Sequence, residues 1–263
     1  MIKSIISVNK KFMDIAPKRL IEIINKSKST SGIELFINCK DQLEMNYLEA
    51  LVHEIKKTNL ILQIHCDIEN SLEDQIIYLK KLENYSQYLN QKIVITFHPV
   101  YDKDKNISIL KTKEYMNKII KEINNNNLIL CLENLNNLDG IYRLKKEDLY
   151  SVLIPDEKIF LTYDMGHELV ELETINYPSN ELLEEIRNVH IHDCNKGVEH
   201  YPIYKSSSNL NIILKSIKFL INDDYQYSIV YEYDLFECNG DTIEEKIINY
   251  LKSIEFVTKF YNV

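Results

Sequence analysis

Short apolar segments that end in polar residues able to bind a metal recur along the whole chain. Seven of them are IELF, ILQIHC, IVITFH, LILCLEN, IFLTYDMGH, VHIHD and SIVYEYD, whose polar residues include Glu34, His65, His98, Glu133, Asp164, His190 and Glu232. Neighbouring positions in this series lie between 26 residues (Asp164 to His190) and 42 residues (His190 to Glu232) apart. The carboxyl ends of parallel strands lie on one side of a sheet or barrel, so we expect these residues to meet there.

Segments with helical periodicity separate the apolar runs. They are residues 16–27, 44–57, 71–89, 109–123, 142–153, 180–188, 209–221 and 242–261, and with the first run, SIISV, they give eight strand–helix pairs. Such alternation is typical of a parallel sheet. An open doubly wound sheet usually has a glycine-rich turn after its first strand, and SIISVNKKF has no glycine. Polar ends on most strands also suit a closed ring, so the sequence predicts a single-domain (β/α)8 TIM barrel over residues 1–263.

Composition agrees with one globular domain and narrows the class of partner. The chain has 263 residues, a common length for such barrels, with only five glycines, five prolines and no linker-like stretch. Its net charge of −9 argues against a nucleic-acid partner, because proteins that bind DNA or RNA normally carry a basic surface. The first residues lack the features of a signal peptide, and no apolar run reaches the roughly 20 residues that span a bilayer. We therefore expect a cytoplasmic protein without a membrane segment, and the sequence leaves its oligomeric state open.

Four of the polar residues come from four successive predicted strands. Glu133, Asp164, His190 and Glu232 combine three carboxylates with one imidazole, and in a barrel they project into one quadrant of the mouth. Singly, each side chain could equally cap a helix, pair with a lysine or form a hydrogen bond in the core. As a set they suit a divalent cation such as Mn²⁺, Mg²⁺, Co²⁺ or Zn²⁺, with positions open for substrate or water.

The motifs around these residues resemble those of the xylose isomerase-like barrels. CLEN, DMGH, HIHDCNKGVEHYPI and YEYD carry the resemblance, which extends over nearly the whole chain. That family includes sugar phosphate isomerases/epimerases and DNA-repair enzymes of the endonuclease IV type. The resemblance implies a set of metal ligands, namely Glu133, Asp164, His190 and Glu232. His190 is preferred to His192 because the family's histidine has an acidic residue three positions on, here Asp193. A strand that ends one residue later would select His192 instead.

The remaining histidines near the strand ends take different roles in the two branches that the chain resembles. In the endonuclease branch, histidines that match His65 and His98 bind a second metal, bridged by the residue that matches Glu133. In the sugar-processing branch they contact substrate or water. His167 and His200 match ligands of a third metal, but that site also needs an aspartate where this chain has Val198, with Glu199 on the wrong side of an extended backbone. We therefore expect His167 to orient substrate or a ligand. A role in binding a second metal or the substrate is predicted for His65, His98, His167, His200 and Glu34.

Three functions are consistent with these features. The first is a sugar or sugar-phosphate isomerase/epimerase, in which a metal chelates a small carbohydrate while Glu133 and Glu232 move a proton next to its carbonyl. The second is a metal-dependent phosphodiester hydrolase of the endonuclease IV type, favoured by His65 and His98 but opposed by the acidic charge. The third is a barrel that binds a ligand without catalysis, which the intact ligand set disfavours. The isomerase/epimerase is favoured, while its substrate, stereochemistry, metal identity and metal number stay open.

Overall fold

Eight parallel strands close into a barrel in the computed structural model, which describes residues 2–66, 71–123, 127–137, 141–153, 158–195, 198–222, 225 and 227–260. Their order around the ring is β1-β10-β7-β6-β5-β4-β3-β2, so the first strand pairs with the last. The strands are β1 (Lys3–Val8), β2 (Gly32–Ile37), β3 (Ile61–Cys66), β4 (Ile93–Phe97), β5 (Leu128–Glu133), β6 (Ile159–Asp164), β7 (Ile186–Ile191) and β10 (Ser228–Tyr231). The predicted (β/α)8 TIM barrel is confirmed.

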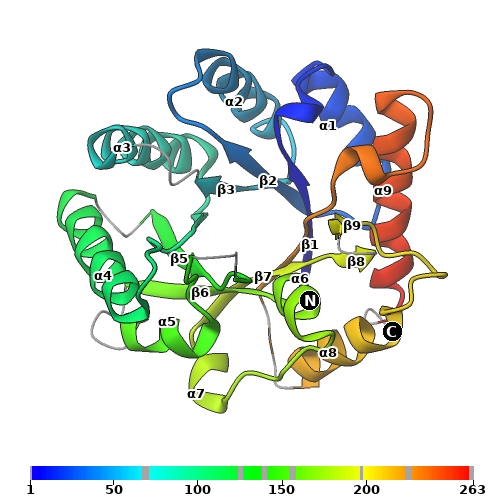
Figure 1. Ribbon diagram of the computed structural model, residues 1–263. Coiled ribbons are helices and arrows are strands. Elements are labelled where there is room, and N and C mark those ends of the chain that lie inside the picture. Colours follow the sequence, from blue (N-terminus) through cyan, green and yellow to red (C-terminus); the bar gives the residue numbers. More distant parts are fainter. Residues whose placement is uncertain are drawn as a thin grey trace.

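Helices surround the barrel in a ring (Figure 1). They are α1 (Pro17–Lys26), α2 (Gln42–Ile55), α3 (Leu72–Leu89), α4 (Lys105–Glu122), α5 (Lys146–Leu153), α8 (Leu210–Asn222) and α9 (Ile243–Thr258). Each overlaps a predicted helix, but α2 and α4 begin earlier than the apolar periodicity indicated, because Asp41 and Asp104 cap their first turns. Tyr261, near the predicted end of the last helix, lies outside the described residues. Across the described ranges, no helix has the length and apolar character required to cross a membrane.

The predicted helix over residues 180–188 is wrong in its second half. Only Asn180–Leu183 are helical (α7), with the Ser179 side chain as the N-cap, and residues 186–188 belong to β7. Leu182, Leu183 and Ile186 have helical spacing, but pairing of β7 with β6 and β10 satisfies the backbone from Ile186 onward. The helix that directly follows β6 is α6 (Met165–Leu172), which begins inside the DMGH motif.

A two-stranded antiparallel sheet follows β7 in the chain. It consists of β8 (Asp193–Asn195) and β9 (Val198–Tyr201), which in Figure 1 lie inside the ring of helices. Two 3-10 helices lie in other loops, η1 (Lys10–Phe12) after β1 and η2 (Leu235–Glu237) after β10. Because α6 contacts both β8 and β9, the segments that follow β6 and β7 lie together.

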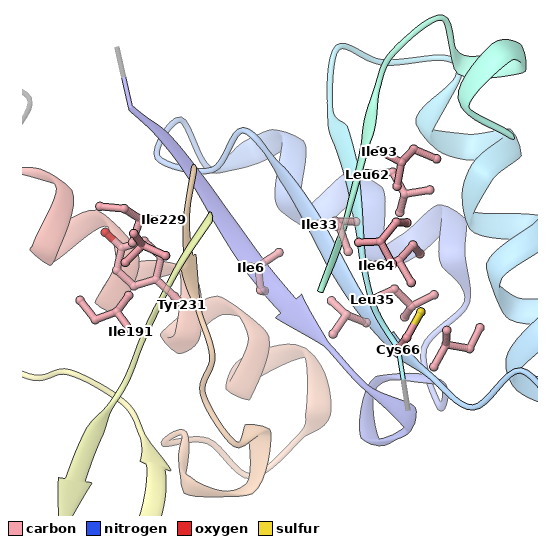
Figure 2. Packing of buried hydrophobic residues seen from close by; sticks show 14 of the residues in the cluster. Ile6, Ile33, Leu35, Leu62, Ile64, Cys66, Ile93, Ile191, Ile229 and Tyr231 are labelled. Atoms are coloured by element: carbon pink, nitrogen blue, oxygen red, sulfur yellow. The ribbon is translucent and has the colours of Figure 1, made fainter. Parts of the chain in front are cut away.

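The two faces of the barrel strands carry different residue types. Apolar side chains such as Ile33, Leu35, Leu62 and Ile64 alternate along β2 and β3 and are buried in the core (Figure 2). The residues between them point into the barrel, where side-chain hydrogen bonds connect β3 to β10, β10 to its neighbour β7, and β4 to β6. These bonds join Gln63 Nε2 to Ser228 Oγ (2.6 Å), Ser228 Oγ to Asn188 Oδ1 (2.9 Å) and Thr96 Oγ1 to Thr162 Oγ1 (2.9 Å). We call these five residues the polar belt. It takes the place of the branched apolar side chains that usually fill such barrels.

Candidate functional site

Four predicted ligands meet at the carboxyl ends of four strands. Glu133 is the last residue of β5 and Asp164 the last of β6. His190 lies one residue before the end of β7, and Glu232 directly follows β10. One oxygen or nitrogen of each side chain lies within 4.8 Å of the corresponding atoms of the others. We call this set the four-residue site; Glu133, Asp164 and His190 are buried, and the Glu232 side chain is 15% exposed.

His190 is at the centre of the four-residue site. Its Nδ1 lies 2.6 Å from Glu133 Oε1, 3.4 Å from Glu232 Oε2 and 3.9 Å from Asp164 Oδ2. Its Nε2 lies 3.0 Å from Glu34 Oε1. When Nε2–H donates to Glu34, Nδ1 keeps its lone pair for a cation, an arrangement in which a carboxylate commonly orients a metal-binding histidine.

Glu34 is not at the barrel mouth, where its place in the IELF segment predicted it. β2 continues to Ile37, because Leu35 and Ile37 pack into the outer core, so Glu34 lies within the strand and is fully buried. Nδ2 of Asn188, a member of the polar belt, donates to Glu34 Oε2 at 3.0 Å. Glu34 therefore contacts His190 from inside the barrel.

His65 and His98 both contact the same oxygen of Glu133. Nε2 of His65 lies 3.0 Å from Glu133 Oε2, and Nε2 of His98 lies 3.1 Å from it. His65 is buried on β3, whereas His98, directly after β4, keeps part of its ring exposed. Glu133 thus faces His190 with one oxygen and these two histidines with the other. The three side chains form a further group that could hold a cation.

Asp164 is held in place by both its side chain and its backbone. Oδ1 accepts the backbone N–H of His167 at 2.8 Å and so caps the N-terminus of α6. The amide of Asn134 donates to the main-chain oxygen of Asp164 at 2.8 Å and accepts its N–H at 2.9 Å. This pair of bonds connects the end of β5 to the end of β6 and fixes the direction of the Asp164 carboxylate.

Three more histidines gather next to Asp164. His167 lies in the first turn of α6, His192 directly follows β7, and His200 lies in β9. Nε2 of His167 is 3.7 Å from Asp164 Oδ2, and Nε2 of His192 is 3.7 Å from Asp164 Oδ1. His200 contacts the four-residue site through Glu232, whose Oε2 lies 3.7 Å from its Nδ1. The structure thus brings all the predicted site residues into one contiguous cluster and adds His192 to it.

The charge of this cluster fits a cation. Its four carboxylates belong to Glu34, Glu133, Asp164 and Glu232, and in the described part of the chain no lysine or arginine forms an ion pair with any of them. Asp164 Oδ2 is buried without a hydrogen-bond partner. Burial of several carboxylates whose charge is only partly compensated is costly. A divalent ion on the oxygen-rich four-residue site would remove that cost.

The carboxylates and imidazoles perturb one another's protonation. Burial lowers the pKa of His190, but the charges of Glu34, Glu133 and Glu232 outweigh burial and raise this pKa well above its usual range. For Glu133, burial favours the neutral form, yet the charges of His190 and His65 hold the pKa well below that of an ordinary glutamate. Without a metal, the site at neutral pH therefore holds a protonated His190 beside an ionised Glu133.

Next to them, burial changes the protonation of Asp164 and its neighbouring histidines. Burial, reinforced by the charges of Glu133 and Glu232, raises the pKa of Asp164 to about 6. It lowers the pKa of His167 and that of His192 to about 4 each. At pH 7 these two imidazoles are therefore neutral, which is the form of histidine that binds metals.

Metal uptake should therefore release protons. Because His190 is protonated at pH 7 and an ion needs the lone pair of its Nδ1, we expect release of about one proton per ion bound at the four-residue site. Ion affinity should rise with pH, and it should fall more steeply below pH 6, where Asp164, with its pKa of about 6, also takes up a proton. Titration calorimetry in two buffers of different ionisation enthalpy counts these protons. Uptake of the ion with no proton release at pH 7 would contradict the prediction.

A cavity of about 440 Å³ opens beside Glu232 and His200. Its wall also includes residues from the loops after β1 and β2, among them Asn9, Lys10 and Asn38. Of the four-residue site, Glu232 is the member that lines this cavity. Substrate entering the cavity would therefore meet Glu232 first.

Two asparagines at the site were not predicted from the sequence. Asn188 lies two residues before His190, so the period-two alternation of a strand places both on one face, and this signal could have identified it. Asn134 directly follows Glu133 in CLEN, but nothing in the sequence indicates that its amide bonds to the neighbouring strand.

Comparison with known proteins agrees with the fold. A family model described as xylose isomerase-like TIM barrel matches residues 29–254, a range that contains every residue of the cluster. Among curated proteins, no sequence matches the chain.

Solved structures with this fold include two sugar epimerases and one epimerase-like protein. A D-tagatose 3-epimerase-like protein has 16% sequence identity and a TM-score of 0.70, with 99% of this chain and 97% of that chain covered. The apo form of 3-keto-D-glucoside 4-epimerase from E. coli has 13% identity and a TM-score of 0.70, covering 98% and 100%. D-psicose 3-epimerase with D-tagatose, from Clostridium cellulolyticum H10, has 14% identity and a TM-score of 0.68, covering 98% of each chain. At these identities the similarity establishes the fold.

Proposed function

This chain belongs to the xylose isomerase-like TIM barrel family, and on that premise we propose that it is a metal-dependent isomerase or epimerase of a sugar or sugar phosphate. Glu133, Asp164, His190 and Glu232 would hold the divalent ion, which can be Mn²⁺, Zn²⁺, Co²⁺ or Mg²⁺ by the chemistry of these donors. The observation that carries the proposal is the set of carboxylates around His190 that no lysine or arginine neutralises within the described ranges. The bound ion supplies positive charge that stabilises developing negative charge on the substrate oxygens.

In this proposal Glu133 and Glu232 carry the proton. Both approach His190 Nδ1, but they come from different strands, β5 and the end of β10, so their carboxylates can flank a substrate from two sides. Burial favours neutral Glu232, yet the charges of His190 and His200 outweigh burial and lower its pKa below the usual range, which keeps it ionised at neutral pH. One carboxylate takes the proton from the carbon next to the carbonyl, and the C–H electron pair moves into the enediolate. Return of the proton to the opposite face gives an epimer, and return to the neighbouring carbon gives an isomer.

The cavity beside Glu232 supports a substrate of monosaccharide size. Its volume of about 440 Å³ falls in the range of roughly 300–1,000 Å³ that is common for small-molecule sites. Asn9 and Asn38 in its wall offer hydrogen bonds suited to hydroxyl groups. Lys11 is paired with Asp234 at 2.6 Å, whereas Lys10 is exposed and could meet a phosphate. The similar solved structures, which are sugar epimerases or epimerase-like, support the same substrate class.

Hydrogen exchange at carbon tests the proposed reaction. The metal-loaded protein is incubated in D₂O with a panel of ketoses and ketose phosphates, and deuterium incorporation is followed by NMR. We expect a metal-dependent loss of the signal of one carbon-bound proton in at least one compound, and no loss with chelator-treated protein. Absence of exchange across the panel would argue against an isomerase or epimerase.

His65 and His98 favour a second candidate function, hydrolysis of a phosphodiester as in enzymes of the endonuclease IV type. With Glu133 they form a group that could hold another cation beside the four-residue site. The net charge of −9 opposes this function, and Val198, at the position of the missing aspartate, is 46% exposed. Cleavage of an abasic-site oligonucleotide that His98→Ala abolishes, without carbon–hydrogen exchange in any sugar, would select the hydrolase.

A further inference from the structure

One carboxylate in the wall of the cavity beside Glu232 bears on the kind of sugar that can enter. Asp234 follows Glu232 by two positions, and it forms an ion pair with Lys11, which lines the same cavity. We propose that the substrate is a sugar without a phosphate group, and that Asp234 is the residue that excludes phosphorylated sugars. This proposal rests on the proposed function and narrows it to one substrate class.

Asp234 lies where many barrels of this kind bind phosphate. Such barrels frequently hold a phosphate between the loops after the last two strands and the N-terminus of a short extra helix. The short helix after the last strand here is η2, and Asp234 is its N-cap. Oδ1 of Asp234 accepts the backbone N–H of Phe236 at 2.9 Å. A carboxylate of the chain therefore already occupies the position that a phosphate would need.

Contacts with three segments hold this carboxylate in place. Oδ2 of Asp234 lies 2.6 Å from Nζ of Lys11 on η1, and that ammonium lies 4.6 Å from the centre of the Phe236 ring on η2. The backbone N–H of Asp234 donates to the carbonyl oxygen of His200 on β9 at 2.7 Å. Both side chains of the ion pair are 30% exposed, so a ligand can reach them. The negative charge of Asp234 is thus a fixed feature of the cavity wall.

The rest of the wall offers a phosphate little positive charge. Among the described residues that form it, Glu44 and Glu232 add two further carboxylates, and none of the chain's three arginines is present. Because Asp234 pairs with Lys11, Lys10 is the one lysine of this described wall outside an ion pair. A single exposed ammonium on a flexible side chain contributes little to the binding of an anion.

Hydrogen-bond chemistry makes the same distinction between the two kinds of sugar. An ionised carboxylate only accepts hydrogen bonds, and the oxygens of a phosphate ester at neutral pH also act as acceptors. A sugar hydroxyl can instead donate to Asp234 and accept from Lys11. The ion pair therefore attracts a hydroxyl and repels a phosphate, and repulsion of a competitor is a common source of specificity.

Pairs of ketoses with and without a terminal phosphate test the proposal. The pairs are fructose and fructose 6-phosphate, tagatose and tagatose 6-phosphate, and ribulose and ribulose 5-phosphate. Titration calorimetry measures their binding to the metal-loaded protein, and the D₂O assay measures carbon–hydrogen exchange. In every pair that binds, we expect the free sugar to bind at least about tenfold more tightly than its phosphate ester.

Asp234→Asn should weaken this discrimination. Asparagine keeps the N-cap of η2, but the variant lacks the repelling charge and leaves Lys11 unpaired. We expect the ratio of the two affinities to shift at least about fivefold toward the phosphate ester. Lys11→Met should shift the same ratio in the opposite direction, because Asp234 then has no compensating charge. Glu237→Gln removes a carboxylate of η2 that is outside the cavity wall, and this matched control should keep the unmodified ratio.

The affinity ratio separates a role in specificity from a role in stability. Circular dichroism establishes that each variant is folded, and a general loss of stability or of metal would weaken both sugars of a pair alike. An unchanged ratio in folded Asp234→Asn would overturn the proposal. Tighter binding of the phosphate ester by the unmodified protein would also overturn it, while leaving the proposed function intact. Binding and exchange of no sugar in either form would overturn the proposed function, and this proposal with it.

Discussion

Replacement of Glu133 by glutamine is expected to remove most divalent-ion binding and nearly all activity. Glu133 is buried, and its two oxygens contact His190, His65 and His98 at 2.6, 3.0 and 3.1 Å. The glutamine side chain has nearly the same shape as that of glutamate, but it lacks the negative charge that interacts with these three imidazoles. Loss of a residue that merely supports a ligand costs roughly 10- to 100-fold in affinity, so loss of a ligand should cost more than about 100-fold. Without ion and carboxylate, carbon–hydrogen exchange should fall by at least about 10⁴-fold.

Elemental analysis and the D₂O exchange assay measure these two losses separately. Glu22→Gln is a suitable control, since Glu22 is an exposed glutamate on α1 that pairs with Arg19 at 3.3 Å. Ion content in Glu133→Gln equal to that of the control would remove Glu133 from the set of ligands. The proton-transfer proposal would then have to rest on Glu232 alone.

Glu232→Gln should separate catalysis from metal binding. Its side chain is 15% exposed, lines the cavity and lies farther from His190 Nδ1 (3.4 Å) than Glu133 does. We therefore expect a smaller loss of ion affinity than in Glu133→Gln. Exchange should still fall by about 10²- to 10⁴-fold even with saturating ion, because a proton-transferring group typically contributes that much.

Exchange rates at saturating Mn²⁺ and Zn²⁺ provide the measurement for this second variant. Glu237→Gln, an exposed glutamate five positions farther along the same loop, is the matched control and should exchange at the unmodified rate. Should Glu232→Gln retain full exchange with ion bound, Glu232 would be a ligand only, and the proton would have to move through another group.

The barrel could be predicted because its strands and helices alternate with clear periods. The polar residues at strand ends marked the mouth correctly for Glu133, Asp164 and His190, since apolar residues stop where these strands stop. Glu34 was expected at the barrel mouth but lies deeper, because in the sequence a polar residue inside a strand looks the same as one at its end. Its depth depends on the pairing of β2 with β1 and β3, and local sequence does not reveal that register.

Other features depend on contacts that no local pattern encodes. The helix α6 is missing from the predicted helices, because a residue that suits a metal ligand, Asp164, also caps its first turn. The role of His192 beside Asp164 depends on the missing side chain of Gly166, twenty-six positions earlier in the chain. The side-chain amide of Asn134 donates a hydrogen bond to the main chain of Asp164 on the next strand. Both contacts join residues that are far apart in the sequence, and both involve residues that support the site.

Closure of the ring by β1 and β10 determines when this site can exist. Glu34 and His190 are 156 residues apart in the chain, and Gln63 reaches Ser228 across a separation of 165. Before β10 has left the ribosome, Glu232 is not available to the site, and β1 lacks the strand with which it pairs to close the ring. Because domains fold as units during synthesis, the ion must be acquired after the last strand has left the ribosome. In a pulse-labelled sample, the time at which newly made chains begin to retain the ion would therefore show when the ring is complete.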